Sequence, residues 1–305
     1  MEFKKAARKQ AKLRLAISGP SGSGKTWGAL KIAQGLGGRV AVIDTERGSA
    51  SLYSDLTQFD TLELNPPFSP ERYVQALRAA EKAGYETVII DSISHEWNGA
   101  GGCLEINDIV AQTKFKGNTW SAWSVTTPRH RAFIDAILQS PLHVIATMRS
   151  KTETVQDGGR VKKLGMKADT RDGTEYEFTI QLETMHESHL AVASKDRTGL
   201  FAEPHVITAE TGQRLKAWLS SGAPEEPQTE IFTSELPDEL DDRVFVNDPV
   251  LIASKFVEFA HSDGAIQIFD LWNDIKSNKA LAQSVWVELK LSPVEFEYIK
   301  KVLKG

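Results

Sequence analysis

Short apolar runs alternate with longer amphipathic stretches over the first half of the chain. The apolar runs are rich in Val, Ile and Leu and predict β-strands at residues 13–18, 39–44, 61–64, 87–91 and 142–148. The stretches between them predict helices at residues 26–36, 70–83, 104–112 and 128–139. Strands that alternate with helices imply βαβ units, so we expect an α/β fold whose mainly parallel sheet carries helices on both faces.

The pattern changes after Met148. Residues 149–172 are polar, contain several glycines and show little periodicity, which predicts a long loop of the kind that often carries function. Residues 176–183 and 189–194 then predict two antiparallel strands, and residues 208–220 predict a closing helix. We therefore expect the sheet to be completed by antiparallel strands beyond the loop.

The C-terminal part of the chain has a different composition. Residues 221–242 hold eight acidic side chains, no basic one and several prolines, which is typical of a soluble linker. Residues 243–305 predict a small helical domain, in which Ser292 and Glu295 form a capping box around a proline at the first helical position. The predicted organisation is a core of residues 1–220, a linker and a helical region.

Charge follows this division. The whole chain of 305 residues has 36 basic and 41 acidic side chains, a net charge of -5 that argues weakly against a nucleic-acid partner. Residues 221–305 account for 16 of the acidic and 8 of the basic side chains, so residues 1–220 hold 25 acidic and 28 basic ones. The core is thus slightly basic, although the net charge of the whole chain is negative.

Several classes of protein are excluded by what the sequence lacks. No run of about 18 apolar residues suggests a membrane span, and the basic N-terminus lacks the apolar core of a signal peptide. The single cysteine, Cys103, rules out an intrachain disulfide framework. We expect a cytoplasmic protein with no membrane partner.

A phosphate-binding motif opens the first predicted helix. Residues 19–26 read Gly-Pro-Ser-Gly-Ser-Gly-Lys-Thr, which matches G-x-x-x-x-G-K-[ST] in full between a strand and a helix. Glycines let backbone N–H groups wrap phosphates, the lysine reaches the β- and γ-phosphates, and the threonine hydroxyl binds Mg²⁺. A coincidental glycine-rich turn is the less favoured alternative. The sequence predicts ATP and Mg²⁺ as ligands, with the nucleotide held by Gly19, Pro20, Ser21, Gly22, Ser23, Gly24, Lys25, Thr26 and Trp27.

Two acidic positions complete the predicted chemistry. Asp91 ends the buried strand at residues 87–91, where a carboxylate can join Thr26 in holding Mg²⁺, although Asp91 could also cap a helix. Hydrolysis also needs a carboxylate that activates water. Ser92 cannot serve, so the candidates are Glu46, two residues beyond the strand end at Asp44, and Glu96. We favour Glu46, with a surface carboxylate as the alternative for each.

The order of these motifs resembles that of RecA-like ATPases and not that of the AAA+ class. Residues 42–46, Val-Ile-Asp-Thr-Glu, are similar to the RecA strand that ends in the catalytic glutamate. Residues 144–149 resemble the strand whose polar tip senses the γ-phosphate, which implies this role for Thr147, although RecA has an amide there. The resemblance implies DNA-binding loops at residues 95–118 and 149–172.

The resemblance also implies assembly. Lys195 and Arg197 are similar to the paired cations with which RecA-like subunits reach the γ-phosphate of a neighbour; a basic hairpin end is the alternative. We therefore expect ATP to lie between subunits of a ring or filament. Residues 43–50, 66–70 and 148–151 resemble the phage-encoded group of minimal RecA-like ATPases, some of which are single-strand-annealing recombination proteins. That group implies the host cytoplasm as the location.

Basic residues in the two predicted loops are the candidates for single-stranded DNA contact, because such binders track the backbone with cations beside aromatic groups. Ordinary solvated loops are the alternative. The candidates are Lys114, Lys116, Arg149, Lys151, Arg160, Lys162, Lys163, Lys167 and Arg171.

The resulting hypothesis is a DNA-stimulated ATPase that binds single-stranded DNA in phage recombination or annealing. A single-strand-binding or other replication protein is a further expected partner. Two rivals remain. One is an ATP-dependent switch or loader that docks a replication partner through the C-terminal region, and the other is a DNA translocase or helicase-type motor.

Overall fold

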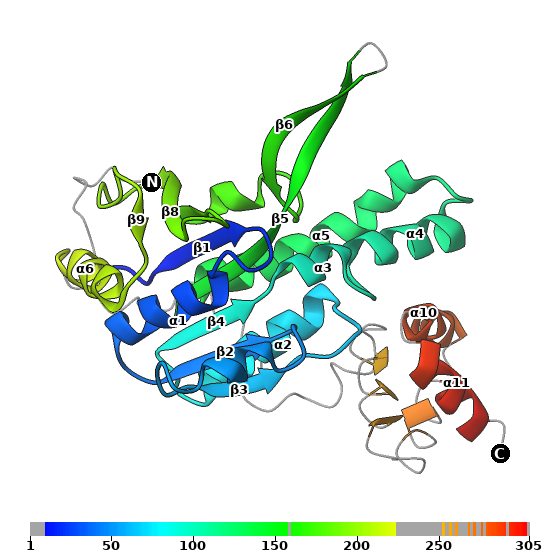
Figure 1. Ribbon diagram of the computed structural model, residues 1–305. Coiled ribbons are helices and arrows are strands. Elements are labelled where there is room, and N and C mark those ends of the chain that lie inside the picture. The colour runs from blue at the N-terminus through cyan, green and yellow to red at the C-terminus, as the bar shows by residue number, and fades with distance from the viewer. Residues whose placement is uncertain are drawn as a thin grey trace, which may run out of the picture. The chain divides into compact units, whose positions relative to one another are not determined.

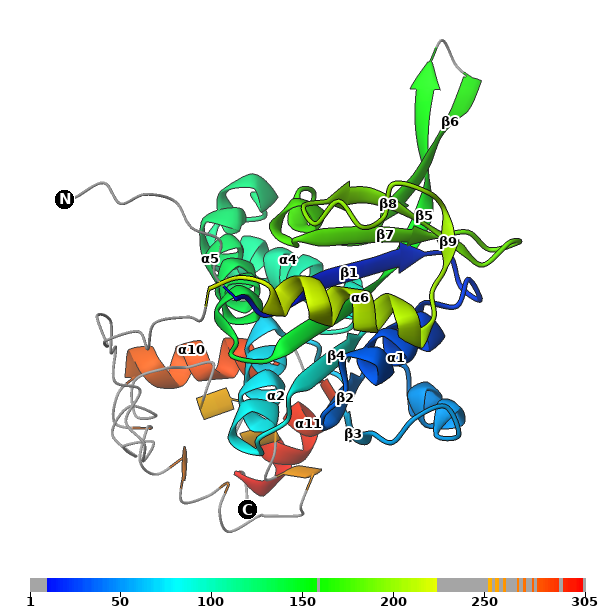
Figure 2. The ribbon, with the colours of Figure 1, turned by 90° about the vertical axis from the view of Figure 1, so that its left-hand side faces the viewer.

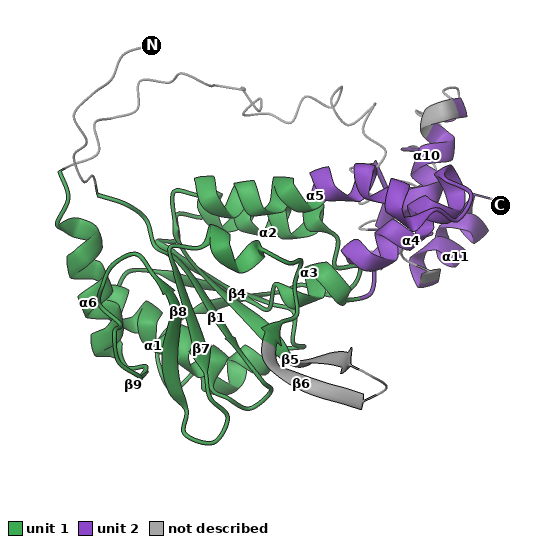
Figure 3. Ribbon diagram, turned by 90° about the horizontal axis from the view of Figure 1, so that it is seen from above, with its two compact units in different colours: residues 1–99, 130–227 green, residues 100–129, 228–305 purple. Residues whose placement is uncertain are grey.

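The computed structural model describes residues 10–157, 160–223, 279–290 and 293–303, with isolated positions between 252 and 276. The side chains of residues 152–166 are not described. Contacts divide the chain into two units, one of residues 1–99 with 130–227 and one of residues 100–129 with 228–305 (Figure 3). The domain division near residue 220 stays a prediction, because most of residues 221–242 lie outside the described residues.

The first unit is built on a mixed sheet, in the order β3-β2-β4-β5-β1-β7-β8-β9 (Figures 1 and 2). Strands β3, β2, β4, β5, β1 and β7 are parallel neighbours, whereas β8 runs antiparallel to β7 and β9 runs antiparallel to β8. The strands are β1 (Arg14–Gly19), β2 (Val40–Asp44), β3 (Asp60–Glu63), β4 (Thr87–Asp91), β5 (His143–Asp157), β7 (Ile180–Thr184), β8 (Leu190–Asp196) and β9 (His205–Val206).

Helices cover both faces of this sheet, as the pattern predicts. Successive residues of β1 point to opposite faces: Leu15 and Ile17 pack with α1 (Lys25–Leu36) and α6 (Ala209–Ser220). Ala16 packs on the other side, with α2 (Pro70–Lys82) and the last turns of α5 (Thr119–Gln139). The α/β fold of the P-loop NTPase type is therefore confirmed.

The region predicted as a long loop is a β-hairpin. Strand β5 runs on past Arg149 to Asp157 and pairs antiparallel with β6 (Arg160–Ala168) (Figure 1). The prediction of a loop over residues 149–172 was wrong because the sequence of the two strands is mostly polar and shows no hydrophobic period. The sequence did contain a hairpin signal, since Asp157 is followed by two glycines.

Two further boundaries differ from prediction. The region compared with a first DNA-binding loop holds α3 (Ser94–Asn98), which the pattern did not predict. It also holds α4 (Cys103–Lys114), which confirms the helix predicted at residues 104–112. Helix α5 begins at Thr119, nine residues before Pro128, the predicted start of the helix. Its first turn is capped by Asn118, whose Oδ1 accepts the N–H of Ser121 at 3.1 Å.

The second unit contains α4, the first turns of α5, α10 (Lys279–Leu289) and α11 (Pro293–Val302). Helix α11 begins at the proline that the sequence placed at its first position. A small core forms around Phe256, Ile268, Val285 and Ile299. In the part of the chain that the structure describes, no helix has both the length and the apolar character needed to cross a bilayer.

Candidate functional site

A cavity of about 800 Å³ lies in the first unit, where the parallel strands β1 and β4 end and β5 continues past them. The volume lies within the range of small-molecule sites, and this edge is where open α/β sheets bind ligands. The P-loop supplies most of one wall. The lining residues are Ser21, Gly22, Ser23, Gly24, Lys25, Thr26, Trp27, Gly28, Glu46, Ser49, Tyr53, Asp91, Arg149, Ser150, Asp169, Thr184, His189, Val206 and Ile207. Gly19 and Pro20, which were also predicted to hold nucleotide, do not line it.

The P-loop has the backbone geometry of an anion site. Gly22 and Gly24 have φ values of 78° and 89°, in the left-handed region that favours glycine. Helix α1 starts beyond Gly24 with no side chain capping its first N–H groups, so these remain available to phosphate oxygens. The Lys25 amine donates to the Pro20 carbonyl at 2.8 Å. The loop thus fits a nucleotide triphosphate tail.

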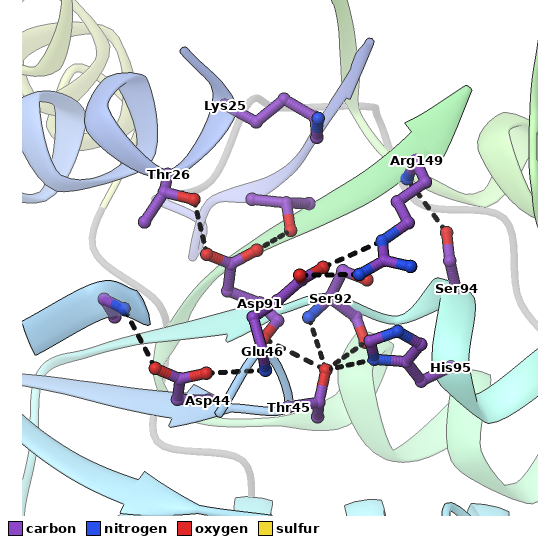
Figure 4. Close-up of polar contacts among 12 residues, drawn as sticks. Lys25, Thr26, Asp44, Thr45, Glu46, Asp91, Ser92, Ser94, His95 and Arg149 are labelled. Carbon is purple, nitrogen blue, oxygen red and sulfur yellow. Dashed lines mark hydrogen bonds and ion pairs between the residues drawn. The ribbon is translucent and has the colours of Figure 1, made fainter. Parts of the chain in front are cut away.

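Asp91 and Thr26 form the oxygen pair expected of a Mg²⁺ site. The Thr26 hydroxyl donates to Asp91 Oδ2 at 2.6 Å, and the Thr147 hydroxyl donates to Oδ1 (Figure 4). Burial raises the pKa of Asp91, and these two hydrogen bonds oppose that rise. Hard oxygen ligands suit Mg²⁺, so the residues present fit the predicted ion.

The backbone at Glu46 is held by its neighbours. Asp44 is buried at the end of β2, and its carboxylate accepts the N–H groups of Glu46 at 2.6 Å and Ala50 at 2.9 Å (Figure 4). The Thr45 hydroxyl accepts the Ser92 N–H at 2.8 Å and lies 2.7 Å from His95 Nδ1. These contacts tie the end of β2 to the end of β4, so that Glu46 reaches the cavity beside Asp91.

Glu46 is paired with Arg149. The guanidinium donates from Nε to Oε1 at 2.9 Å and from Nη2 to Oε2 at 2.6 Å (Figure 4). Burial alone would raise the pKa of Glu46, but the hydrogen bonds and charge of Arg149 lower it overall. Arg149, which was predicted to contact nucleic acid, lines the P-loop cavity, and its contact with nucleic acid stays a prediction.

Two other sequence candidates lie away from the cavity. Thr147 is fully buried behind Asp91 and does not line the cavity, so a direct contact with the γ-phosphate is not available to it here. Glu96 is 1% exposed, and His130 Nδ1 lies 3.1 Å from both its carboxylate oxygens. Of the two glutamates, only Glu46 faces the site.

Lys195 and Arg197 lie at the other edge of the sheet. Lys195 pairs with Gln181 in register, and the backbone N–H of Arg197 donates to the Thr179 carbonyl at 3.2 Å. Lys195 is thus level with Ala16 of β1 and Arg197 with Arg14, which are three and five residues, or about 10 and 16 Å, before the P-loop end of the strand. Arg197 follows the end of β8, so only Lys195 is a strand residue. Neither cation reaches the P-loop of its own chain.

The remaining basic candidates lie in several places. Lys151 pairs with Asp169 at 2.6 Å, and Lys167 pairs with Asp172 at 2.8 Å, near the base of the hairpin. Lys114 ends α4 in the second unit, and Lys116 follows it. Arg171 follows β6. The backbone of Arg160, Lys162 and Lys163 belongs to β6, while their side chains lie outside the described residues.

Sequence reasoning missed the apolar and histidine-bearing parts of the wall. Tyr53 lies in the 3-10 helix η1 (Ser49–Tyr53), and Val206 and Ile207 lie at the end of β9. His189 Nδ1 lies 3.4 Å from the Ser23 carbonyl. An aromatic ring beside aliphatic side chains suits a nucleobase. No spacing rule links these residues to the P-loop, because the fold brings them together.

A comparison with protein families agrees with this geometry. The model of a family described as AAA domain matches residues 11–216, about two-thirds of the chain. The chain belongs to this AAA domain family. The family is of the P-loop ATPase type, which supports nucleotide binding and hydrolysis in general terms and typically involves Mg²⁺. No curated protein matches the chain.

The AAA domain match tests only part of what the order of the motifs predicts. The order favours a RecA-like protein over the AAA+ class, whereas the description of the matching family names the AAA domain. The P-loop ATPase type is common to both and is confirmed. The RecA-like annealing group and a phage origin stay predictions.

Proposed function

We propose that the cavity hydrolyses ATP to ADP and phosphate. The P-loop N–H groups and Lys25 hold the phosphates, while Thr26 and Asp91 are placed to hold Mg²⁺, which neutralises phosphate charge when bound. Glu46 orients the attacking water and accepts its proton as the oxygen bonds to the γ-phosphorus and the bond to ADP breaks. The observation that carries this proposal is the convergence of Lys25, Asp91 and Glu46 on one cavity.

We further propose that the protein binds single-stranded DNA and acts in recombination or annealing. What supports this is the continuity of β5, which passes Asp91 at the cavity and extends eight residues beyond Arg149, about 26 Å. The resulting hairpin carries Lys151, Arg160, Lys162, Lys163 and Lys167 in its sequence. One strand therefore links the phosphate site to a basic projection suited to a nucleic-acid backbone.

Assembly is part of the same proposal. Lys195 and Arg197 are at the wrong edge for their own P-loop, and a neighbouring subunit is the remaining place where they could act on ATP. We expect a ring or filament in which each ATP lies between two copies. In this proposal a single-strand-binding protein or another replication protein is a further partner, and the protein works in a phage-infected cytoplasm.

The DNA proposal predicts a basic contribution from the hairpin. Replacing Arg160, Lys162 and Lys163 with Ala is expected to weaken single-stranded DNA binding and to reduce the slope of log K against log salt by about 2, because each phosphate contact contributes about 0.7. Fluorescence anisotropy with a labelled oligonucleotide over a salt series measures both.

The matched control removes three cations from elsewhere in the same unit, Lys31, Lys82 and Lys216, and should leave the slope unchanged. An identical loss in both triple variants would mean that net charge alone, not the hairpin, binds DNA. Absence of binding at low salt, with or without ATP, would favour the switch or loader. Directional strand displacement would favour the motor.

The apolar wall predicts a contribution to nucleotide affinity. Tyr53→Ala is expected to raise the KM for ATP by about two- to tenfold with little change in kcat, because a lost ring contact removes about 0.5–1.5 kcal/mol of uniform binding. Steady-state kinetics checks this. Leu52→Ala is the matched control, since Leu52 is the adjacent residue, 82% exposed and not part of the cavity wall. Equal effects from both would show that η1, and not the ring, matters.

A further inference from the structure

The ion pair between Glu46 and Arg149 engages both carboxylate oxygens of the proposed catalytic base. Both carboxylate oxygens accept from one guanidinium, at 2.9 and 2.6 Å, in the parallel arrangement that is strongest for this pair (Figure 4). The side chain of Glu46 is 26% exposed and that of Arg149 is 47% exposed, so water screens the pair only in part. The pair stands at the mouth of the phosphate site.

Such a pairing opposes the role of Glu46. A general base must offer an oxygen to the water it activates, and its efficiency falls as its pKa falls. Arg149 lowers the pKa of Glu46 and donates a hydrogen bond to each of its oxygens. The arrangement seen here therefore holds the proposed base in an unreactive state, and hydrolysis requires Arg149 to leave it.

Arg149 has another partner available in the same cavity. Burial lowers the pKa of Lys25, and repulsion from the positive charge of Arg149 lowers it further. The guanidinium is therefore close enough to Lys25 for the two charges to interact. Both cations line the cavity that the P-loop closes on one side. A terminal phosphate beside Lys25 would place multiple negative charges and a matching set of oxygens within this region, and a guanidinium fork fits phosphate as well as carboxylate.

The backbone of Arg149 is anchored while its side chain has room. Its backbone N–H donates to Ser94 Oγ at 2.9 Å. In the pairing of β5 with β1, Arg149 is opposite Gly19, the first residue of the P-loop. The acidic groups that attract the guanidinium are Glu46, Asp91 and Asp169. Asp91 is committed to Thr26 and Thr147, and Asp169 accepts from Lys151, so Glu46 is the partner that a phosphate would displace.

We propose that Arg149 is a γ-phosphate-binding residue that exchanges partners: it binds Glu46 in the nucleotide-free protein and moves to the terminal phosphate of ATP, which frees Glu46. ADP lacks that phosphate and leaves the pair intact. This inference rests on the proposed ATPase function and adds to it a group that distinguishes ATP from ADP. It also explains how the base is withheld until substrate arrives.

The test is a double-mutant cycle on binding, with no turnover required. Calorimetry with Mg²⁺ gives the affinities of a non-hydrolysable ATP analogue and of ADP for the wild type, Arg149→Ala, Glu46→Gln and the double variant. Arg149→Ala should weaken the analogue about tenfold and leave ADP unchanged, because only the terminal phosphate loses a charge-assisted contact. Glu46→Gln should tighten the analogue, because Arg149 is then released from its competing partner.

The cycle separates partner exchange from simple relief of repulsion. If Glu46 only repels phosphate, Glu46→Gln tightens the analogue equally with and without Arg149, and the inference is overturned. Partner exchange requires a tightening at least about threefold larger when Arg149 is present. Arg149→Lys should recover only part of the preference, since an ammonium lacks the planar fork.

Arg39→Ala is the matched control, because Arg39 is 3.8 Å from Asp60 in an exposed pair away from the cavity. It should leave the ratio of the two affinities unchanged. A wild type that binds neither nucleotide would defeat the proposed function itself. A wild type that binds and hydrolyses ATP, with an Arg149→Ala variant of unchanged ratio, would defeat the inference alone.

Discussion

Glu46→Gln is expected to lower ATP turnover by a factor of about 10²–10⁴ while ATP still binds. The amide keeps the size of the side chain but cannot accept a proton from water. Its position is fixed independently of its charge, because Asp44 holds the Glu46 N–H at 2.6 Å and the end of β2 is tied to β4. The loss should therefore appear in kcat, which a phosphate-release assay at saturating ATP measures.

Glu96→Gln is the comparison that makes this result informative. Glu96 is 1% exposed and its carboxylate lies against His130, so the change should cost about 1–3 kcal/mol of unfolding free energy by weakening a buried charged contact. Turnover per folded molecule should stay near that of the wild type. If Glu96→Gln abolished turnover while Glu46→Gln remained active, the assignment of the base would be reversed.

The parts of this fold that could be predicted are those where burial leaves a pattern. Strands β1, β2 and β4 are buried along their length, and each appears in the sequence as a short apolar run. The P-loop is a local motif, so Lys25 and Thr26 follow from spacing alone. Asp91 and Glu46 follow from strand ends, because carboxyl ends of parallel strands meet at one edge.

The parts that could not be predicted depend on contacts between distant segments. Arg149 is 103 residues from Glu46, and its sequence neighbours suggested a DNA loop. The sequence of the hairpin that follows it is polar and gives no periodic signal. Thr147 was assigned to the phosphate by resemblance, yet it lies behind Asp91 and does not line the cavity. Arg149 is on the same face of β5, two residues further along the strand, and it does line the cavity.

The distant position of Lys195 and Arg197 leads to the second large expected effect. Arg197→Ala is expected to lower turnover by at least about 10³-fold if its guanidinium stabilises the transition state on a neighbour's ATP. Lys25→Ala should be inactive by itself, because its P-loop loses the charge that holds the phosphates. Each variant alone is then nearly inactive. One lacks the lysine of the P-loop, and the other lacks the arginine that follows β8.

Mixing the two variants distinguishes action between subunits from action within one. A working site needs Lys25 from one subunit and Arg197 from the next, and an equal mixture forms such an interface at about one position in four. Turnover of the mixture should therefore recover to about a quarter of the wild-type value, with the ratio varied in a phosphate-release assay. Because neither variant chain carries both Lys25 and Arg197, rescue cannot arise inside one chain. A mixture as inactive as its components would show that Arg197 does not act on the ATP of a neighbouring subunit.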